Sequence, residues 1–205
     1  MLHSLYKYLL GFINITPEEW ASINQFLEIR HFNKHVKLIN IGEYERYVNF
    51  VNKGLVRKYF YRNQEEVITQ IAKEGELICS SVSFLSAAVS DYVVETIEPT
   101  TVLSISRENM EKLYDMGSRM ERMGRLVIID WLIQKEYWEN ARIKQLPKER
   151  FLRFVSEKPD LLIRVPQKYL ASYLNVKAET FSRYKRLLLL RPAPLQEPST
   201  QSFTP

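Results

Sequence analysis

The 205-residue sequence has little of what several classes of protein require. Its single cysteine, Cys79, excludes an internal disulfide, and its three histidines, His3, His31 and His35, are not at the spacing of metal ligands. Its apolar runs stay below the roughly eighteen residues of a membrane span, and the N-terminus has no basic-then-apolar signal pattern. We therefore expect a cytoplasmic protein with no metal site, no resident cofactor and no membrane partner.

Catalytic groups are scarce as well. The sequence contains no Ser-His-Asp set with a nucleophile elbow and no glycine loop that would hold a phosphate. Glu65 and Glu66 come nearest to a pair of catalytic carboxylates, but we expect them at the solvated end of a hairpin. The sequence thus predicts no catalytic residues and no enzyme activity.

Positive charge is concentrated in one quarter of the chain. Residues 142–191 contain 13 lysines and arginines against 4 acidic residues, whereas residues 1–141 contain 16 basic and 19 acidic residues. The formal net charge of +5 therefore comes from this one segment. Such a segment has the charge that binding to nucleic-acid phosphates requires.

Within the basic segment, residues 165–186 (VPQKYLASYLNVKAETFSRYKR) have the pattern of a helix-turn-helix. A first helix is predicted from about Gln167 to Leu174, with Pro166 at its start, where a missing N–H costs nothing. Ala171 is small enough to lie where two helices cross closely.

The turn and the second helix follow. Asn175 is predicted to have a positive φ, which Asn tolerates better than most residues with a side chain. Val176 would fill the angle between the helices. The second helix is predicted over 178–189, and its inward residues are Phe181, Tyr184 and Leu188.

The outward face of the second helix carries polar side chains at i, i+3, i+4 and i+7. They are Glu179, Ser182, Arg183 and Arg186. Such donors and acceptors are of the kind that contact base edges in a major groove. On hydrophobic spacing alone, an amphipathic helix pair with a solvated face fits equally well, and such a pair would engage a protein. The charge distribution favours DNA.

In the first half of the chain, the residue pattern changes near residue 31 from one typical of helices to one typical of strands. Residues 1 to about 30 are predicted to be helical, with Thr16 as the N-cap of a helix that begins at Pro17. From about 31 to 106, β-branched and aromatic residues form short runs separated by Gly or charge, which indicates an antiparallel sandwich or jelly roll. The predicted strands are Lys37–Ile41, Tyr47–Val51, Leu55–Tyr61, Val67–Ile71, Tyr92–Thr96 and Thr101–Ile105.

Residues 107–144 are predicted to form a long helix. One face carries Met116, Met120, Met123, Val127, Tyr137 and Ala141, with Asp130 and Gln134 completing its register. An adjacent flank carries Leu126, Ile129, Ile133 and Trp138. A helix with apolar residues on more than one face is expected to pack on its own domain and on a symmetry partner, with Asp130 and Gln134 in the seam. The alternative is a helix that packs on its own domain alone.

Within the basic segment, Pro147 ends the long helix. A helix over Lys148–Glu157 is predicted with Phe151, Leu152 and Val155 inward, and Leu161–Val165 is predicted as a short strand before the helix-turn-helix. Residues 192–205 contain four prolines and are expected to be a disordered tail.

This order of elements resembles the Crp/Fnr superfamily of bacterial transcription regulators, over about residues 15–190. The resemblance is strongest in residues 149–186, which are similar to the DNA-binding module of Bacteroidetes-type members. The E-T-x-S-R string formed by Glu179, Thr180, Ser182 and Arg183 resembles the recognition helix of Fnr-like members. Gly42, the Gly54-Leu55-Val56 stretch and the Gly75-Glu76-Leu77 triplet match the β-roll pattern more weakly.

The resemblance implies an α+β fold with an antiparallel β-roll (jelly roll), a long dimerisation helix and a C-terminal helix-turn-helix of the winged type. The domains would be residues 1–106, 107–144 and 145–191, followed by the tail. It also implies a homodimer that binds a palindromic site in double-stranded DNA and acts on RNA polymerase. The expected DNA-binding residues are Gln167, Lys168, Lys177, Glu179, Thr180, Ser182, Arg183, Lys185 and Arg186.

The departures from the family concern the effector. Cyclic-nucleotide-responsive members hold the phosphate with an Arg followed by Ser or Thr, and the corresponding place here is about Ser90-Asp91-Tyr92. Between Arg62 and Arg107 the only basic residue is Lys73, so a buried phosphate would go uncompensated. Glu76 matches the ribose-binding Glu of such pockets. One cysteine cannot supply the four ligands of an iron–sulfur cluster. We expect an unidentified small-molecule effector in the β-roll, or none, and not cyclic AMP.

Overall fold

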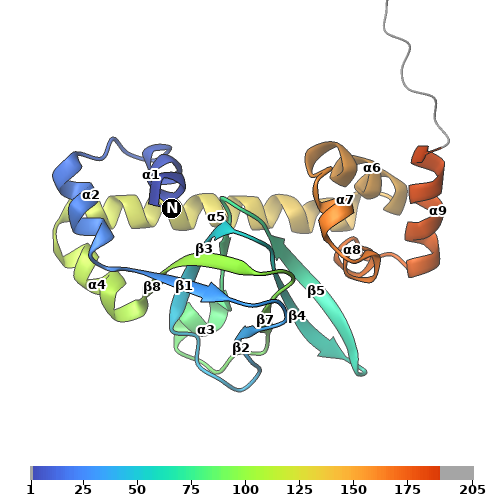
Figure 1. Cartoon of the computed structure of the whole chain (residues 1–205), viewed down its shortest axis with the longest axis horizontal. Coiled ribbons are helices and arrows are strands. Elements are labelled where there is room, and N and C mark those ends of the chain that lie inside the picture. Colours follow the sequence, from blue (N-terminus) through green and yellow to red (C-terminus); the bar gives the residue numbers. More distant parts are fainter. Residues whose placement is uncertain (1, 190–205) are drawn as a thin grey trace, which may run out of the picture.

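The computed structural model describes residues 2–189, so the predicted tail and residues 190–191 lie outside the described residues. Figure 1 shows two N-terminal helices, a roll of strands, a long helix and a group of short helices, in the predicted order. The N-terminal helices are α1 (Leu2–Leu10) and α2 (Pro17–Asn24). The predicted N-cap of α2 is confirmed, because Thr16 Oγ1 accepts a hydrogen bond from the Glu19 N–H at 3.2 Å.

The β-roll consists of two four-stranded antiparallel sheets. One has the strand order β1-β8-β3-β6 and the other β2-β7-β4-β5. Between them lies a core of aliphatic side chains that includes Val51, Val94 and Val102, each fully buried. The strands are β1 (Leu27–Phe32), β2 (Lys37–Ile39), β3 (Tyr47–Lys53), β4 (Val56–Arg62), β5 (Glu65–Ala72), β6 (Leu77–Ile78), β7 (Val93–Thr96) and β8 (Thr100–Ser106).

All six predicted strands are present, but the roll begins earlier than predicted. The expectation of helix up to about residue 30 is wrong, since β1 starts at Leu27 and pairs with β8 along its whole length. Pairing with residues 68 to 78 positions away outweighs the local pattern here. Glu65 and Glu66 belong to β5, and the turn before them is formed by Asn63 and Gln64, both with positive φ.

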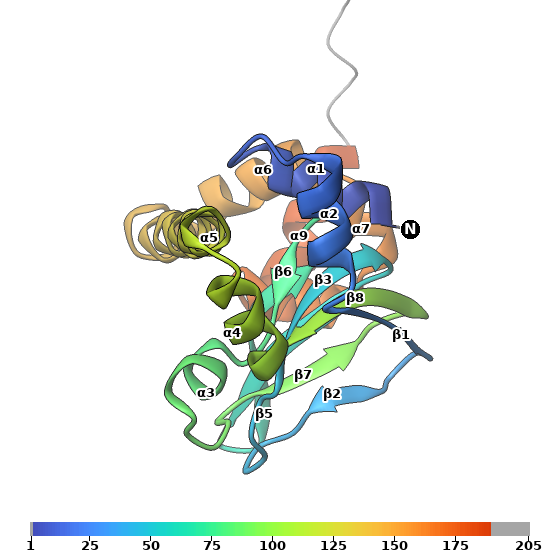
Figure 2. The same ribbon diagram turned by 90° about the vertical axis from the view of Figure 1, so that its left-hand side faces the viewer.

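The predicted helix over 107–144 is two helices. They are α4 (Arg107–Asp115) and α5 (Ser118–Lys144). Gly117, with a φ of 136°, lets the chain reverse between them. Gly124 then allows Tyr114 of α4 to lie against α5, because a Cβ there would come within 2.3 Å of Tyr114 Cε1. Figure 2, which looks along α5, shows this helix beside the roll.

The face of α5 predicted to form a dimer seam is partly covered by the chain itself. Met120 and Met123 are buried in a cluster with Leu5 and Leu9 of α1, and Val127 packs against that cluster. Met120 and Met123 therefore pack within their own chain, and a seam that contains Asp130 and Gln134 stays a prediction. Helix α1, which lies in the region predicted to be helical, occupies this face.

The C-terminal helices are α6 (Pro147–Glu157), α7 (Leu161–Arg164), α8 (Gln167–Tyr173) and α9 (Ala178–Leu189). No strand follows β8 in residues 2–189, so the predicted strand over Leu161–Val165 and the winged type of helix-turn-helix are not found. Leu161 and Val165 are both buried, and a helical turn places residues four apart on one face. In α6, Phe151 is buried as predicted, but Phe154 takes the inward place expected for Leu152, which is exposed.

None of the described helices combines the length and the apolar character that crossing a membrane would need.

Candidate nucleic-acid interface

The predicted helix-turn-helix is present as α8, a tight turn and α9. The Leu174 N–H donates to Leu170 O at 2.9 Å, and the Val176 N–H donates to Ala171 O at 2.9 Å, which closes the turn. Asn175 has a φ of 52°, as predicted for the turn residue. Ala171 is buried and Val176 packs against the same core, so the small residue and the wedge lie where the sequence placed them.

Aromatic packing holds α9 against α6. Phe181 is 1% exposed, and its ring meets that of Phe151 edge-on at a centroid distance of 5.3 Å. Tyr184 contacts Phe151 at 5.4 Å, and Leu188 packs against the same cluster. The three residues predicted to point inward do so, which fixes the opposite face of α9 outward.

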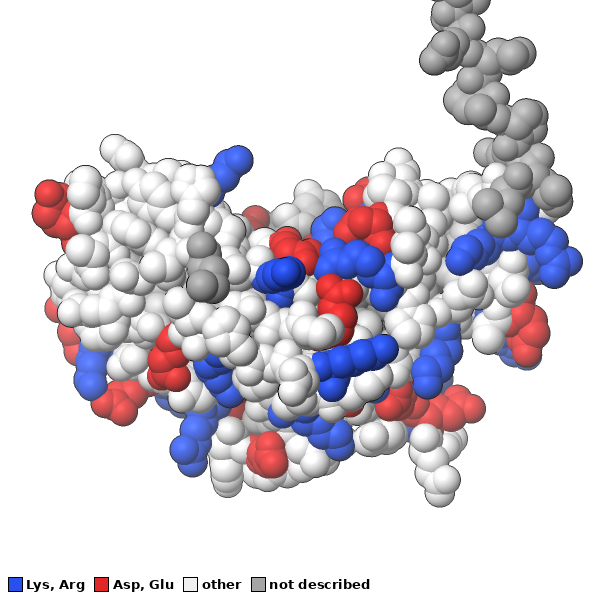
Figure 3. Space-filling model, viewed as in Figure 1, with Lys and Arg blue, Asp and Glu red and all other residues white. Residues whose placement is uncertain are grey.

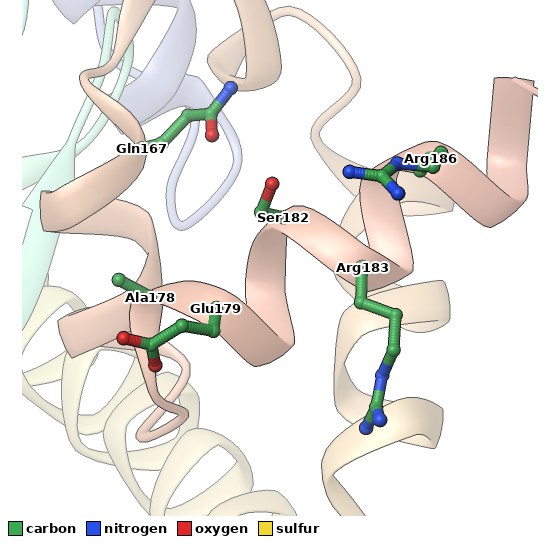
Figure 4. Close-up of a pocket in the computed structure, with 6 residues that line it drawn as sticks. All are labelled: Gln167, Ala178, Glu179, Ser182, Arg183 and Arg186. Atoms are coloured by element: carbon green, nitrogen blue, oxygen red, sulfur yellow. The ribbon is translucent and has the colours of Figure 1, made fainter.

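That outward face is open to solvent and hollowed. Glu179, Ser182, Arg183 and Arg186 are exposed and line one surface hollow together with Ala178 and Gln167. Figure 4 shows that Gln167 comes from α8 and the others from α9, with the two arginines extending in different directions. Five of the nine predicted DNA-binding residues are therefore brought together at one place.

The other four predicted residues surround this hollow without lining it. Lys168 and Lys177 are exposed, whereas Thr180 and Lys185 are half-buried. The ammonium of Lys168 lies 5.0 Å from the centre of the Tyr169 ring. Figure 3 shows Lys and Arg side chains gathered at the end of the molecule where α8 and α9 lie.

Comparison with known proteins supports the architecture. Residues 29–116 match the family model described as the cyclic nucleotide-binding domain. The structure of FixK2 from Bradyrhizobium japonicum superposes with a TM-score of 0.67 at 20% identity, covering 80% of this chain and 84% of that one. The chain has the Crp/Fnr fold. A regulator assigned to the Crp/Fnr family from Eubacterium rectale superposes with a TM-score of 0.63 at 15% identity, covering 90% of this chain and 88% of that one.

A third neighbour of the same fold is the c-di-GMP-responsive regulator CLP from Xanthomonas campestris. Its TM-score is 0.63 at 15% identity, and the superposition covers 85% of this chain and 92% of that one. No curated protein sequence matches the chain.

One arginine of this Crp/Fnr fold has a structural task that the sequence did not reveal. Arg150 is 5% exposed, and its guanidinium donates to Gln145 O at 2.6 Å, Arg142 O at 3.1 Å and Leu174 O at 3.2 Å. It ties the end of α5 to the turn of the helix-turn-helix. Burial lowers the pKa of Arg150, and carbonyl oxygens are its only hydrogen-bond partners among the described residues. Charge counting could not separate this arginine from those free to meet phosphate.

Inside the roll, the region that would face an effector is held by hydrogen bonds among its own groups. Glu45 accepts from the Ser80 N–H at 3.0 Å, and the hydroxyls of Ser80 and Ser90 are hydrogen-bonded to each other at 2.7 Å. The segment between Arg62 and Arg107 is not the only source of a cation, because Lys58 on β4 is 8% exposed and donates to Cys79 O at 3.3 Å. Burial lowers the pKa of Lys58.

A metal centre has no basis in the described residues, where no group of three or more His, Cys, Asp or Glu is placed to hold an ion.

Proposed function

We propose that the protein is a homodimeric, sequence-specific DNA-binding transcription regulator. The observation that carries this proposal is the outward face of α9, where Glu179, Ser182, Arg183 and Arg186 are all exposed above the buried Phe181. A helix of this kind, projecting from a helix-turn-helix with basic surroundings, fits a major groove. RNA polymerase is the partner through which such a regulator would act on transcription.

Each side chain on this face has a distinct role in the proposed complex. Arg183 makes a bidentate contact with a guanine, Glu179 accepts from a cytosine N4–H, and Ser182 serves a base or a phosphate. Thr180, which is half-buried, flanks this set.

The remaining groups meet phosphate. Gln167 lies at the start of α8, where backbone N–H groups favour an anion. Lys168, Lys177, Lys185 and Arg186 give affinity and salt dependence with little sequence preference.

The dimer would pair the two copies of α5. Ile129, Leu132 and Ile133 are 41%, 57% and 45% exposed, and they form an apolar row on the side of that helix opposite the buried Met120 and Met123. Burying this row against its copy about a two-fold axis would place two recognition helices about 34 Å apart, one turn of DNA.

The effector, if the roll binds one, is not cyclic AMP in this proposal. The hydroxyl of Ser90 already bonds to Ser80 and to Tyr92 O, and Asp91 would repel a phosphate. A thermal-shift titration with cyclic AMP is expected to leave the melting temperature unchanged, and a saturable rise would contradict this point.

Selection of binding sites from random duplex DNA tests the proposed function directly. We expect enrichment of a palindrome whose half-sites lie one helical turn apart, bound with an affinity that falls steeply as salt rises. Recovery of no sequence, together with retention on heparin that does not respond to salt, would instead favour a protein partner for the helix-turn-helix.

A further inference from the structure

The β-roll and the C-terminal helices share one hydrophobic core. The roll contributes side chains from β5, β7 and the residue before β4, among them Ile68, Val93 and Leu55, and the helices contribute Phe154, Leu170 and others. Leu55, Ile68, Val93 and Leu170 are fully buried. The helix-turn-helix is thus docked on the roll, and the arrangement of the two parts is set by specific contacts.

The first contact closes an open sheet edge. β5 is the last strand of its sheet, so its outer backbone groups have no strand beside them. Ser172 of α8 takes that place: its hydroxyl accepts from the Ile68 N–H at 3.0 Å and donates to Glu66 O at 3.0 Å. Because both bonds involve backbone of the roll, they fix where α8 lies along β5.

The second contact is a buried arginine between the two parts. Arg57 of β4 is 3% exposed, and its guanidinium lies between the rings of Tyr59 and Tyr169, at 4.2 and 4.0 Å from their centres. It is ion-paired with Glu66 and Glu95. This cation–π contact holds Tyr169, on α8, against the roll.

The third contact is a set of ion pairs that cross the junction. Lys158 Nζ lies 2.7 Å from Glu76 Oε1, and Lys73 Nζ lies 2.9 Å from Asp160 Oδ1. Arg164 reaches Glu74 at 2.7 Å and Glu98 at 2.5 Å. Figure 3 shows acidic and basic side chains intermixed between the roll and the C-terminal helices. Lys158 and Arg164 of the basic segment therefore pair with carboxylates of the roll and do not contact DNA.

We propose that these contacts form a latch that holds the recognition helix in its DNA-binding orientation, with Arg57, Ser172 and Glu76 as positioning residues. This inference rests on the proposed function. While the latch is closed, the outward face of α9 stays exposed. Figure 1 shows α9 beyond the end of α5 and running across the direction of that helix. With two α5 helices side by side, both recognition helices would face the same duplex.

Glu76 thereby has a task different from the one that its match to a ribose-binding Glu suggests. One carboxylate oxygen pairs with Lys158, and the other accepts from the Lys73 N–H at 3.2 Å. Its side chain holds the roll to α6.

Charge reversal at this pair tests the latch. Glu76→Lys sets two ammonium groups against each other, which should open the latch and lower the affinity for a two-half-site palindrome about tenfold relative to an isolated half-site. An added positive charge acting on DNA alone would raise the affinity for both duplexes. The exchanged pair, Glu76→Lys with Lys158→Glu, should restore the palindrome-to-half-site ratio to within about twofold of the parent.

A second measurement needs no DNA. Hydrogen exchange of the Ile68 amide, which donates to Ser172, should speed up in Glu76→Lys and return to the parent rate in the exchanged pair. This arm supports the latch even when the parent protein binds no DNA, so it separates failure of the latch from failure of the proposed function. An Ile68 amide that exchanges equally slowly in all three proteins would overturn the latch.

Asp160→Lys against Lys73 provides an independent pair should Glu76→Lys not fold. The Asp160 side chain is 37% exposed, so the substitution is tolerable at the surface. Asp160→Lys should lower the palindrome-to-half-site affinity ratio as Glu76→Lys does. The exchanged pair, Asp160→Lys with Lys73→Asp, should restore that ratio. Loss of palindrome preference without rescue by either exchanged pair would also overturn the proposal.

Discussion

At the scale of single residues, environment separates side chains that the sequence makes equivalent. Arg150 and Arg183 both belong to the basic segment, yet Arg150 is buried among carbonyl oxygens and Arg183 is exposed on α9. A buried guanidinium whose three nitrogens all donate to backbone carbonyls is held in place and is not available to a ligand. An exposed one keeps its planar fork for a guanine or a phosphate.

Arg183→Ala should relax the preference at one base pair, because a bidentate contact with guanine contributes about 1–3 kcal/mol of discrimination. Lys185→Ala should weaken binding to all sequences about equally, since an ammonium on phosphate carries no sequence information. Fluorescence anisotropy at fixed salt on the selected site and its single-base variants measures both effects. Arg183→Lys is the matched control for charge: it should keep the salt dependence and lose the discrimination. Equal losses on specific and random DNA for Arg183→Ala and Lys185→Ala would contradict these roles.

Asn175→Val should destabilise the protein by about 1–2 kcal/mol, because a left-handed backbone is costly for a residue with a branched side chain. Asn175→Gly should change the free energy of unfolding by only a few tenths of a kcal/mol, since Gly adopts positive φ readily but gains freedom when unfolded. Urea denaturation of both variants measures the difference. A Val variant as stable as the parent would mean that the turn does not require this φ of 52°.

At the scale of elements, the sequence predicts the helices and strands that are determined by the residues within the segment itself. The six predicted strands have β-branched and aromatic residues in sufficient density, and the helix-turn-helix has Pro166, Ala171 and Asn175 at fixed offsets. β6 has two residues and depends on pairing with β3, so its sequence carries no pattern of its own. β1 likewise depends on β8.

The candidate site shows the same division. The outward residues of α9 follow from helical periodicity, which the sequence contains. The junction with the roll depends on Arg57 and Ser172, which are distant in sequence from the residues that they contact. Periodicity within one segment could not foresee these contacts.

Helix α5 supplies the element-scale prediction. Leu132→Glu should convert a dimer to monomers, because burying a leucine contributes about 1.5–3 kcal/mol and a two-fold interface contains it twice. The dissociation constant should rise about a hundredfold or more, as measured by sedimentation over a range of protein concentrations.

Ile163→Glu is the matched control for Leu132→Glu. Ile163 is 90% exposed on α7, away from α5, so its charged variant should remain dimeric. If Leu132→Glu stays dimeric as well, the two copies associate through another surface. Val127→Glu is a poorer test, because Val127 packs within its own chain. A charge there would also disrupt the packing of α1 against α5.

At the scale of the whole molecule, acidic groups of the roll face basic groups of the C-terminal segment, and acid should therefore separate the two parts. Burial alone would raise the pKa of Glu74, but hydrogen bonds from Arg164 and from the Gly54 N–H hold it at about 2. The pKa of Asp160 is likewise lowered by Lys73 against the effect of burial. Arg164 also faces Glu98 and Asp160, so these carboxylates act on one cation.

A carboxyl group whose pKa is lowered in the folded state stabilises that state at a pH above its ordinary value and loses this contribution as the pH falls. The ordinary value for Glu is 4.5, so the contribution of Glu74 should disappear between about pH 4.5 and pH 2. Trp138 of α5 stacks on Tyr173 of α8 at 4.3 Å and packs against the core that the roll and the C-terminal helices share, so its fluorescence reports on the separation. Because three tryptophans are present, comparison with Trp138→Phe identifies the part of the fluorescence change that comes from Trp138.

Glu74→Gln removes the titrating group and should flatten the acid transition while lowering stability at neutral pH. A transition of the same midpoint and amplitude in Glu74→Gln would show that other carboxylates hold the two parts together.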